Sequence, residues 1–354
     1  MSLLVLRIKS LAMSFKFIFI VLLSCITVSG CSDNKLSNED DKAGLNESYK
    51  KGYEKGYDQG DKDADATAGN KPLARYKGLY VDNFSQILGD SLLENELLTY
   101  ARDSGFTTLS LYGLQAILKE NTITETITQQ LSNFIFKAKT NYSIKCITAV
   151  GECADFFRNV ISVYNHFRPL KHQRIDACNL EFEFWNYVAI GGEGQENYCT
   201  YYLKKSGEKC DVKGAYNYYI QQLSEIHKLA TADSCLCETY VGYVDAHQAK
   251  EIAALVDRVL IHAYVLIPFT TYDDSYERLS FFGGTKDTTN IILIFSSEPK
   301  FMGNWLKNHE ESTVFKTYVG LYNIIKNHFK LHLNLIGYQW FVYSDMPKMQ
   351  FGKK

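Results

Sequence analysis

The feature that most constrains the fold is a regular alternation of short apolar segments with longer amphipathic ones after residue 74. The short segments are rich in β-branched and aromatic residues, which favours strands, whereas the longer ones carry apolar residues at helical spacing. The predicted strands are 78–82, 107–112, 143–150, 178–185, 238–244, 258–265, 290–295 and 336–343, and the predicted helices include 91–103, 124–138, 154–166, 215–230, 246–257 and 315–328. Eight such units predict an α/β fold, a (β/α)8 TIM barrel. An open doubly wound sheet is the alternative, although no Gly-x-Gly-x-x-Gly motif follows the first predicted strand.

The first 30 residues have the pattern of an export signal. Arg7, Lys9 and Lys16 precede an apolar run over 17–28, which is too short for a spanning helix. The run ends at Cys31 in the sequence Val-Ser-Gly-Cys, which resembles the lipobox of bacterial lipoproteins. That resemblance implies that Cys31 is lipidated and anchors the protein to a membrane of the bacterial cell envelope, with the outer membrane or cell surface preferred. An ordinary signal peptide with an incidental cysteine is the alternative.

Residues 31–74 form a predicted tether, and residues 75–354 form the predicted barrel domain. The tether is polar and almost free of large aliphatic residues, so it buries too little apolar surface to offset the entropy of ordering. Tyrosine and glycine recur at four-residue spacing over 49–60. This repeat is a possible surface for a protein partner, although glycine in every turn disfavours an isolated helix.

Composition excludes some classes of function. The net charge of −2 and the absence of a basic stretch give no indication of nucleic-acid binding. No four ligands at regular spacing mark a zinc site, and we expect neither a metal nor an organic cofactor. Cys199 and Cys210 flank a short polar loop, and they are the preferred disulfide pair in an exported protein.

The most informative single stretch is 174–185, RIDACNLEFEFW. If it is a strand, its two-residue period places Asn179, Glu181, Glu183 and Trp185 on one face. Buried carboxylates require partners or a raised pKa, so such a face is typical of a functional cavity. An exposed antiparallel strand with glutamates on its solvent side explains the same pattern.

Polar and aromatic residues also follow the other predicted strands. In a barrel, active sites lie at the C-terminal ends of the strands. The residues at these positions are Asp82, Asn83, Tyr112, Glu152, Glu181, Glu183, Trp185, Tyr243, Asp245, His262, Tyr264, Ser297, Glu298, Trp340 and Tyr343. An isolated histidine such as His262 is more typical of a hydrogen-bonded structural residue.

The stretch from Asp176 to Glu183 resembles the Asp-x-x-Asp-x-Asp-x-Glu signature of family 18 glycoside hydrolases, the chitinases and endo-β-N-acetylglucosaminidases. The resemblance implies that Glu183 is the general acid and that Glu181 orients the N-acetyl group of the substrate, which attacks the anomeric carbon. Tyr264 matches the tyrosine of the sixth-strand motif, and Trp340 matches the tryptophan beneath the sugar. The sequence has Asn179, Glu181 and Val265 where the family pattern has aspartate.

Two functions follow from these residues. The first is retaining, substrate-assisted hydrolysis of β-linked N-acetylhexosamine glycans, chitin-like or N-glycan, by Glu183, Glu181 and Tyr264. The substrate-binding residues would be Trp340, Asn179, Trp185, Tyr112, Tyr243 and Asp82. The second is a catalytically inactive, glycan-binding lipoprotein on the same barrel, since aromatic platforms bind sugars without a tuned acid pair. A scaffold role through the Tyr/Gly repeat is the least favoured alternative.

Overall fold

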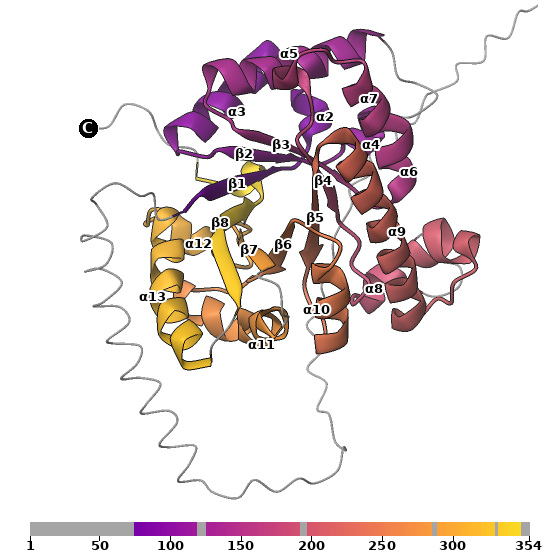
Figure 1. The fold of residues 1–354 in the computed structure, drawn as a ribbon. Helices are drawn as coiled ribbons and strands as arrows, with labels where there is room; N and C mark the ends of the chain where they lie inside the picture. Colours follow the sequence, from indigo (N-terminus) through magenta and orange to yellow (C-terminus); the bar gives the residue numbers. More distant parts are fainter. Residues whose placement is uncertain (1–73, 119–124, 192–196, 285–288, 330–331, 348–354) are drawn as a thin grey trace, which may run out of the picture. The chain divides into compact units, whose positions relative to one another are not determined.

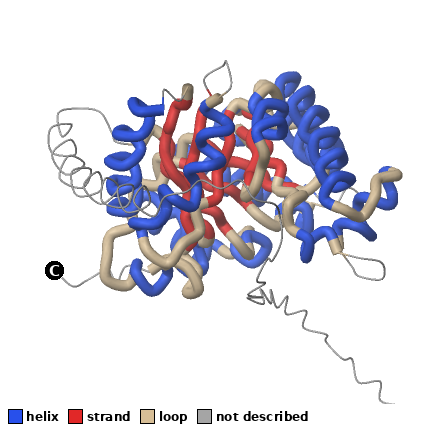
Figure 2. The backbone as a smooth tube through the Cα atoms, turned by 90° about the horizontal axis from the view of Figure 1, so that it is seen from below, coloured by secondary structure: helices blue, strands red, loops and turns tan. Residues whose placement is uncertain are grey.

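Eight parallel strands form the centre of the molecule. The computed structural model describes residues 74–118, 125–191, 197–284, 289–329 and 332–347. The predicted signal peptide, Cys31, the tether and the Tyr/Gly repeat therefore lie outside the described residues. The strands pair in sequence order, and β8 pairs with β1 to close a barrel surrounded by helices (Figure 1). Figure 2 shows the strands enclosed by this helical layer. The predicted TIM barrel is confirmed.

The strands are β1 (Tyr76–Val81), β2 (Thr108–Leu111), β3 (Cys146–Gly151), β4 (Ala177–Leu180), β5 (Leu236–Val241), β6 (Arg258–His262), β7 (Thr289–Ser296) and β8 (Leu333–Phe341). The longer helices are α3 (Ser91–Asp103), α5 (Glu125–Asn141), α9 (Val212–Asp233), α10 (Ala246–Ala253), α11 (Thr271–Gly283) and α13 (Ser312–Phe329). Shorter helices are α2 (Phe84–Ile87), α4 (Leu114–Ile117), α6 (Ala154–Phe156), α7 (Val163–His166), α8 (Tyr187–Ile190) and α12 (Gly303–Leu306). No described helix is both long and apolar enough to cross a membrane.

Several strands end earlier than their sequences predict, and in β4 and β6 the difference affects predicted site residues. β4 ends at Leu180, so Glu181, Glu183 and Trp185 lie in the loop that leaves it. β6 ends at His262, and Tyr264 follows it in the same way. The helix α11 is absent from the predicted set, because its first turns contain Tyr, Asp and Ser, which are weak helix formers.

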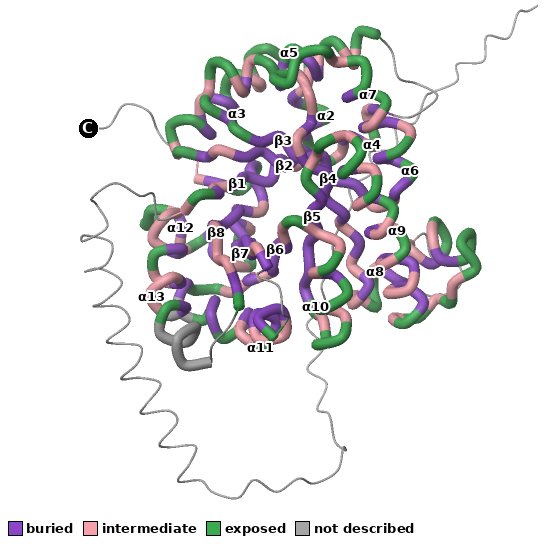
Figure 3. Tube along the Cα trace, in the orientation of Figure 1, coloured by how far each residue is buried: buried purple, intermediate pink, exposed green. Residues whose placement is uncertain are grey.

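The two faces of the barrel wall differ in composition. The outward side chains of the strands and the inner faces of the helices form one large apolar core, which includes Leu79, Phe182, Phe184 and Trp340. Figure 3 shows the strands buried and the outer helix surfaces exposed. The lumen holds a second, smaller apolar cluster. It also holds a polar network, in which the fully buried Glu238 forms an ion pair with Arg258. The inward face therefore carries the polar chemistry of the fold.

The orientation of β8 is fixed by one buried glutamine. The Gln339 side-chain oxygen accepts hydrogen bonds from the Tyr76 hydroxyl at 2.8 Å and the Ser110 hydroxyl at 2.9 Å, inside the lumen. Since side chains alternate along a strand, Phe341 also points inward, while Tyr338 and Trp340 point outward. This parity decides which aromatic residues of β8 reach the lumen.

Candidate active site

The loop that leaves β4 divides its side chains between two environments. Phe182 and Phe184 are buried in the outer apolar core, whereas Glu181, Glu183 and Trp185 are partly exposed. The predicted alternation of acids and aromatic residues therefore persists beyond the strand itself. Asn179 is buried within β4, in register with Glu238 of the lumen network. These positions place the two loop glutamates at the C-terminal mouth of the barrel.

Glu181 is held by a tyrosine of the barrel wall. Its carboxylate accepts a hydrogen bond from the hydroxyl of Tyr80, which belongs to β1. Burial raises the pKa of Glu181 to about 8; the Tyr80 hydrogen bond opposes this, and the charges of Glu183 and Glu152 add to it. At neutral pH Glu181 therefore holds a proton, and a neutral carboxyl group donates as well as accepts hydrogen bonds.

Glu183 has a different set of partners. Its carboxylate accepts a hydrogen bond from the Asn186 side-chain amide at 2.6 Å, and its backbone N–H points to the Tyr198 hydroxyl at 3.4 Å. Burial raises the pKa of Glu183, while the Asn186 hydrogen bond and the charge of Lys300 oppose the rise. Burial, and not the charge of the neighbouring Glu181, is therefore the main cause of the raised pKa at Glu183.

Glu152 is a third carboxylate at the mouth that the sequence placed at a strand exit but not in the site. It follows β3 directly and accepts a hydrogen bond from the Tyr202 hydroxyl at 2.5 Å. Burial raises the pKa of Glu152, the Tyr202 hydrogen bond lowers it, and the charge of Glu183 raises it. The available signal was its place immediately after the apolar strand, which it shares with Glu181. We call Glu152, Glu181 and Glu183 the acid cluster.

The exit of β6 contributes two rings that pack edge to face. His262 and Tyr264 have ring centroids 3.7 Å apart, and Tyr264 also packs against Phe341 at 5.7 Å. Burial and the nearby charge of Arg278 lower the pKa of His262 to about 3, so its ring is neutral. Burial raises the pKa of Tyr264 well above its usual value, and the charges of Tyr240, Glu181 and Glu183 add to the rise, so its phenol stays protonated.

Other predicted binding residues form the edge of the mouth. Tyr112 and Tyr243 follow β2 and β5 and are 41% and 58% exposed. The Trp185 ring lies over Gly242, where an added Cβ would meet the indole at 2.6 Å, and packs edge-on against Tyr240. Asp82, in contrast, accepts hydrogen bonds from the backbone N–H of Ser344 and the amide of Asn83, so its carboxylate holds the loop after β8.

Trp340 lies on the opposite side of the barrel wall from the acid cluster, which corrects its predicted place beneath a sugar. Its side chain is fully buried in the outer core against Phe295, and its indole N–H points to the Glu311 carboxylate at 3.3 Å. The physical reason is the parity of β8, since Gln339 occupies the inward position next to it. Phe341 is the β8 ring that lies inside the barrel, 4.9 Å from Tyr80.

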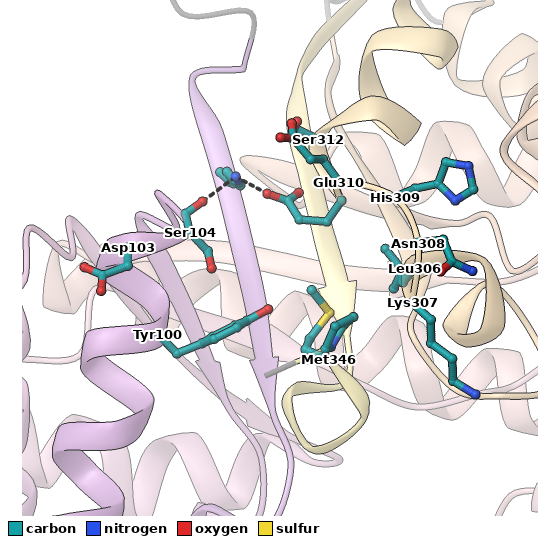
Figure 4. Close-up of a pocket in the computed structure, with 13 residues that line it drawn as sticks. Tyr100, Asp103, Ser104, Leu306, Lys307, Asn308, His309, Glu310, Ser312 and Met346 are labelled. Atoms are coloured by element: carbon teal, nitrogen blue, oxygen red, sulfur yellow. Dashed lines mark hydrogen bonds and ion pairs between the residues drawn. The ribbon is translucent and has the colours of Figure 1, made fainter. Parts of the chain in front are cut away.

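Two cavities near these residues differ in position. One of about 570 Å³ lies over the ends of β2 and β3 and is lined by Tyr112, Glu152, Asp155 and Asn159 among others, so it adjoins the acid cluster. The other, of about 510 Å³, lies outside the barrel between the end of α3 and the α12–α13 connection. Figure 4 shows Tyr100 directing its hydroxyl into this second cavity.

Charged groups beside the second cavity are already paired with other groups of the protein. Lys77 forms an ion pair with Glu311, and the second carboxylate oxygen of Glu311 accepts a hydrogen bond from Tyr338 at 2.7 Å. Among the described residues, no group of three or more His, Cys, Asp or Glu side chains is arranged to hold a metal ion. The mouth with the acid cluster is thus the better candidate for chemistry.

Comparisons with known proteins give only distant structural matches. No family model matches the sequence, and no curated protein matches it. Among solved structures, a GH18 chitinase from Pseudoalteromonas aurantia is 10% identical, with 78% of this chain and 96% of that chain covered and a TM-score of 0.43. The C-terminal domain of a putative chitinase from Desulfitobacterium hafniense is 10% identical, with 78% and 95% covered and a TM-score of 0.46. Tryptophan synthase subunit alpha from Legionella pneumophila is 9% identical, with 80% and 86% covered and a TM-score of 0.37. Such distant matches to barrels of different activity do not distinguish one function from another.

Proposed function

We propose that the mouth of the barrel binds β-linked N-acetylhexosamine glycans, chitin-like or N-glycan, and hydrolyses them with retention of configuration. The observation that carries the proposal is the acid cluster. Three carboxylates from the ends of β3 and β4 lie at the face where barrel enzymes act, and the pKa of each is raised by burial. A structural role alone does not account for three acids in one partly buried place whose hydrogen-bond partners, Tyr80, Asn186 and Tyr202, carry no positive charge.

The proposed roles follow from the position of each group. Glu183 donates a proton to the glycosidic oxygen while the acetamido oxygen of the substrate attacks the anomeric carbon, and water then opens the cyclic intermediate. Glu181, protonated at neutral pH, orients the acetamido group by hydrogen bonding. Tyr264 donates its phenolic hydrogen bond to the same group. Trp185, with Tyr112 and Tyr243 at the edge, supplies the aromatic surface for the sugar rings in place of Trp340.

A binding protein without hydrolysis is the second candidate, and one observation favours it. The outward position of Trp340 and the presence of Val265 remove two features of the resemblance to family 18 hydrolases, whereas the exposed rings of Tyr112 and Tyr243 remain available to a ligand. Sugar binding needs such rings and polar edges but no tuned acid. We propose for either function that the protein is a bacterial envelope lipoprotein anchored at Cys31.

A glycan array combined with a hydrolysis screen on chitooligosaccharides and N-glycans tests the proposal. We expect Glu183→Gln to lower hydrolysis by about a hundredfold or more while binding persists, because the amide keeps the shape but has no transferable proton. Glu225→Gln is the matched control, since Glu225 is exposed on α9 and paired with Arg158. Binding without turnover on any N-acetylated substrate would support the second candidate, and the absence of binding to every glycan would contradict both.

A further inference from the structure

The segment that follows α8 carries a disulfide and two tyrosines that reach the acid cluster. Cys199 and Cys210 are joined by a disulfide, and the chain between them forms a π-helical turn over Cys199–Leu203 and a short 3-10 turn over Lys204–Ser206. Cys199 and Leu203 are buried, so one side of this stapled segment, residues 198–210, is fixed to the body of the protein. The segment lies beside α8 and the start of α9 (Figure 1).

The stapled segment packs behind the loop that bears Glu181 and Glu183. Tyr198 stacks on Phe182 with ring centroids 4.0 Å apart, and Tyr202 packs edge-on against the same ring at 5.8 Å. Phe182 lies between the two glutamates in the sequence, so its ring holds the backbone from which both acids project. Tyr218 of α9 completes the group at 5.0 Å from Phe182. The tyrosines therefore join the segment to the acid-bearing loop.

The Tyr202 hydroxyl makes the direct contact with the acid cluster. It donates to the Glu152 carboxylate at 2.5 Å, across 50 residues of sequence. The charge of Glu152 helps to raise the pKa of groups from several elements around it, namely Tyr112, Cys153, Glu181, Tyr198, Tyr202 and Tyr218. The charge of Glu183 in turn raises the pKa of Glu152. The charge of Glu152 is one of those that raise the pKa of Glu181. A hydrogen bond that favours the charged form of Glu152 thus also acts on the proton held by Glu181.

We infer that Tyr202 is a positioning residue, held by the Cys199–Cys210 disulfide, which orients Glu152 and stabilises its charged form in the acid cluster. Its functional consequence rests on the proposed function, because the charge state of the cluster then determines the pH range of ligand binding and turnover. The inference itself concerns the titration of Glu152 and needs no substrate. It can therefore fail or succeed independently of glycan hydrolysis.

Tyr202→Phe provides the first test. The substitution removes the hydroxyl but keeps the ring contacts, so Glu152 loses a hydrogen bond to its charged form, and its pKa should rise by about one unit. The measurement is carbon-13 NMR of labelled glutamate carboxyl groups, with the Glu152 signal identified by its loss in Glu152→Gln. Tyr216→Phe is the matched control, because it removes a tyrosine hydroxyl bonded to Glu251 at 2.7 Å outside the cluster. An unchanged Glu152 titration in Tyr202→Phe would overturn the inference.

The disulfide is tested by repeating the substitution without it. In the Cys199→Ser/Cys210→Ser background, Tyr202 is no longer held, so Tyr202→Phe should shift the Glu152 pKa much less than it does in the wild type. A pKa shift of equal size with and without the disulfide would show that the disulfide does not hold Tyr202 in place against Glu152. Far-UV circular dichroism establishes that each variant retains the barrel, and a variant that loses it is replaced by Cys210→Ser alone.

Discussion

At the scale of single residues, the site is defined by which carboxyl group keeps its proton. Glu181 and Glu183 belong to one short loop and share a face, yet their partners differ. Burial raises the pKa of both groups. At Glu181 the Tyr80 hydrogen bond opposes the rise but the charges of Glu183 and Glu152 add to it, whereas at Glu183 both the Asn186 hydrogen bond and the charge of Lys300 oppose it. The local field therefore favours the neutral form more strongly at Glu181.

This difference predicts a pH dependence of stability. The pKa of Glu181 is about 8 in the folded protein and near 4.5 when the group is unperturbed, so between these values the unfolded chain binds fewer protons. Stability should therefore fall as the pH rises from 4.5 to 8, by up to about 1.4 kcal/mol per pH unit from this group. Glu181→Gln should flatten the slope, because an amide does not titrate. Urea unfolding at several pH values provides the measurement, and equal slopes for both proteins would contradict the pKa.

At the scale of elements, the inward and outward alternation of side chains along β8 determines which tryptophan contributes to stability and which to binding. Trp340 packs in the outer core with Phe295 and donates to Glu311, whereas Trp185 lies over Gly242 at the mouth. We predict that Trp340→Phe lowers the free energy of unfolding by about 2 kcal/mol, through lost ring volume and a lost hydrogen bond, and leaves glycan affinity unchanged. Trp185→Phe should weaken glycan binding with a smaller effect on unfolding. Calorimetric titration with a chitooligosaccharide and denaturant unfolding measure the two quantities, and the reverse pattern would be incompatible with this strand orientation.

At the scale of the whole molecule, we propose that the barrel carries the chemistry and that the N-terminal segment determines where the protein is located. The proposed lipid anchor would require Cys31, because the lipobox resemblance assigns acylation to that cysteine. We predict that Cys31→Ser abolishes fatty-acid labelling and moves the protein from the detergent phase to the aqueous phase, while the barrel keeps its thermal transition. Cys153→Ser is the control, since Cys153 lies in the barrel. Detergent partitioning that is the same in Cys31→Ser and wild type would remove the lipoprotein proposal.

The sequence by itself determined the barrel and the general position of the acids. Strand and helix patterns are local, so the alternation of segments was sufficient to predict eight β/α units. The loop after β4 also has a local signal, because charged residues at Glu181 and Glu183 alternate with Phe182 and Phe184. One of these two sets must face the apolar helices, and only the phenylalanines do so without cost.

Only the tertiary structure decided the orientation of β8 and the partners of the acids. A strand that is buried on both sides is apolar on both faces, so its sequence does not distinguish inward from outward residues. For β8 the distinction comes from Gln339, whose partners Tyr76 and Ser110 lie more than 200 residues away. The contact of Tyr202 with Glu152 is likewise made by chain segments that no local pattern connects. Protonation of Glu181 depends on this same assembly, because burial and neighbouring charge arise only when the barrel closes.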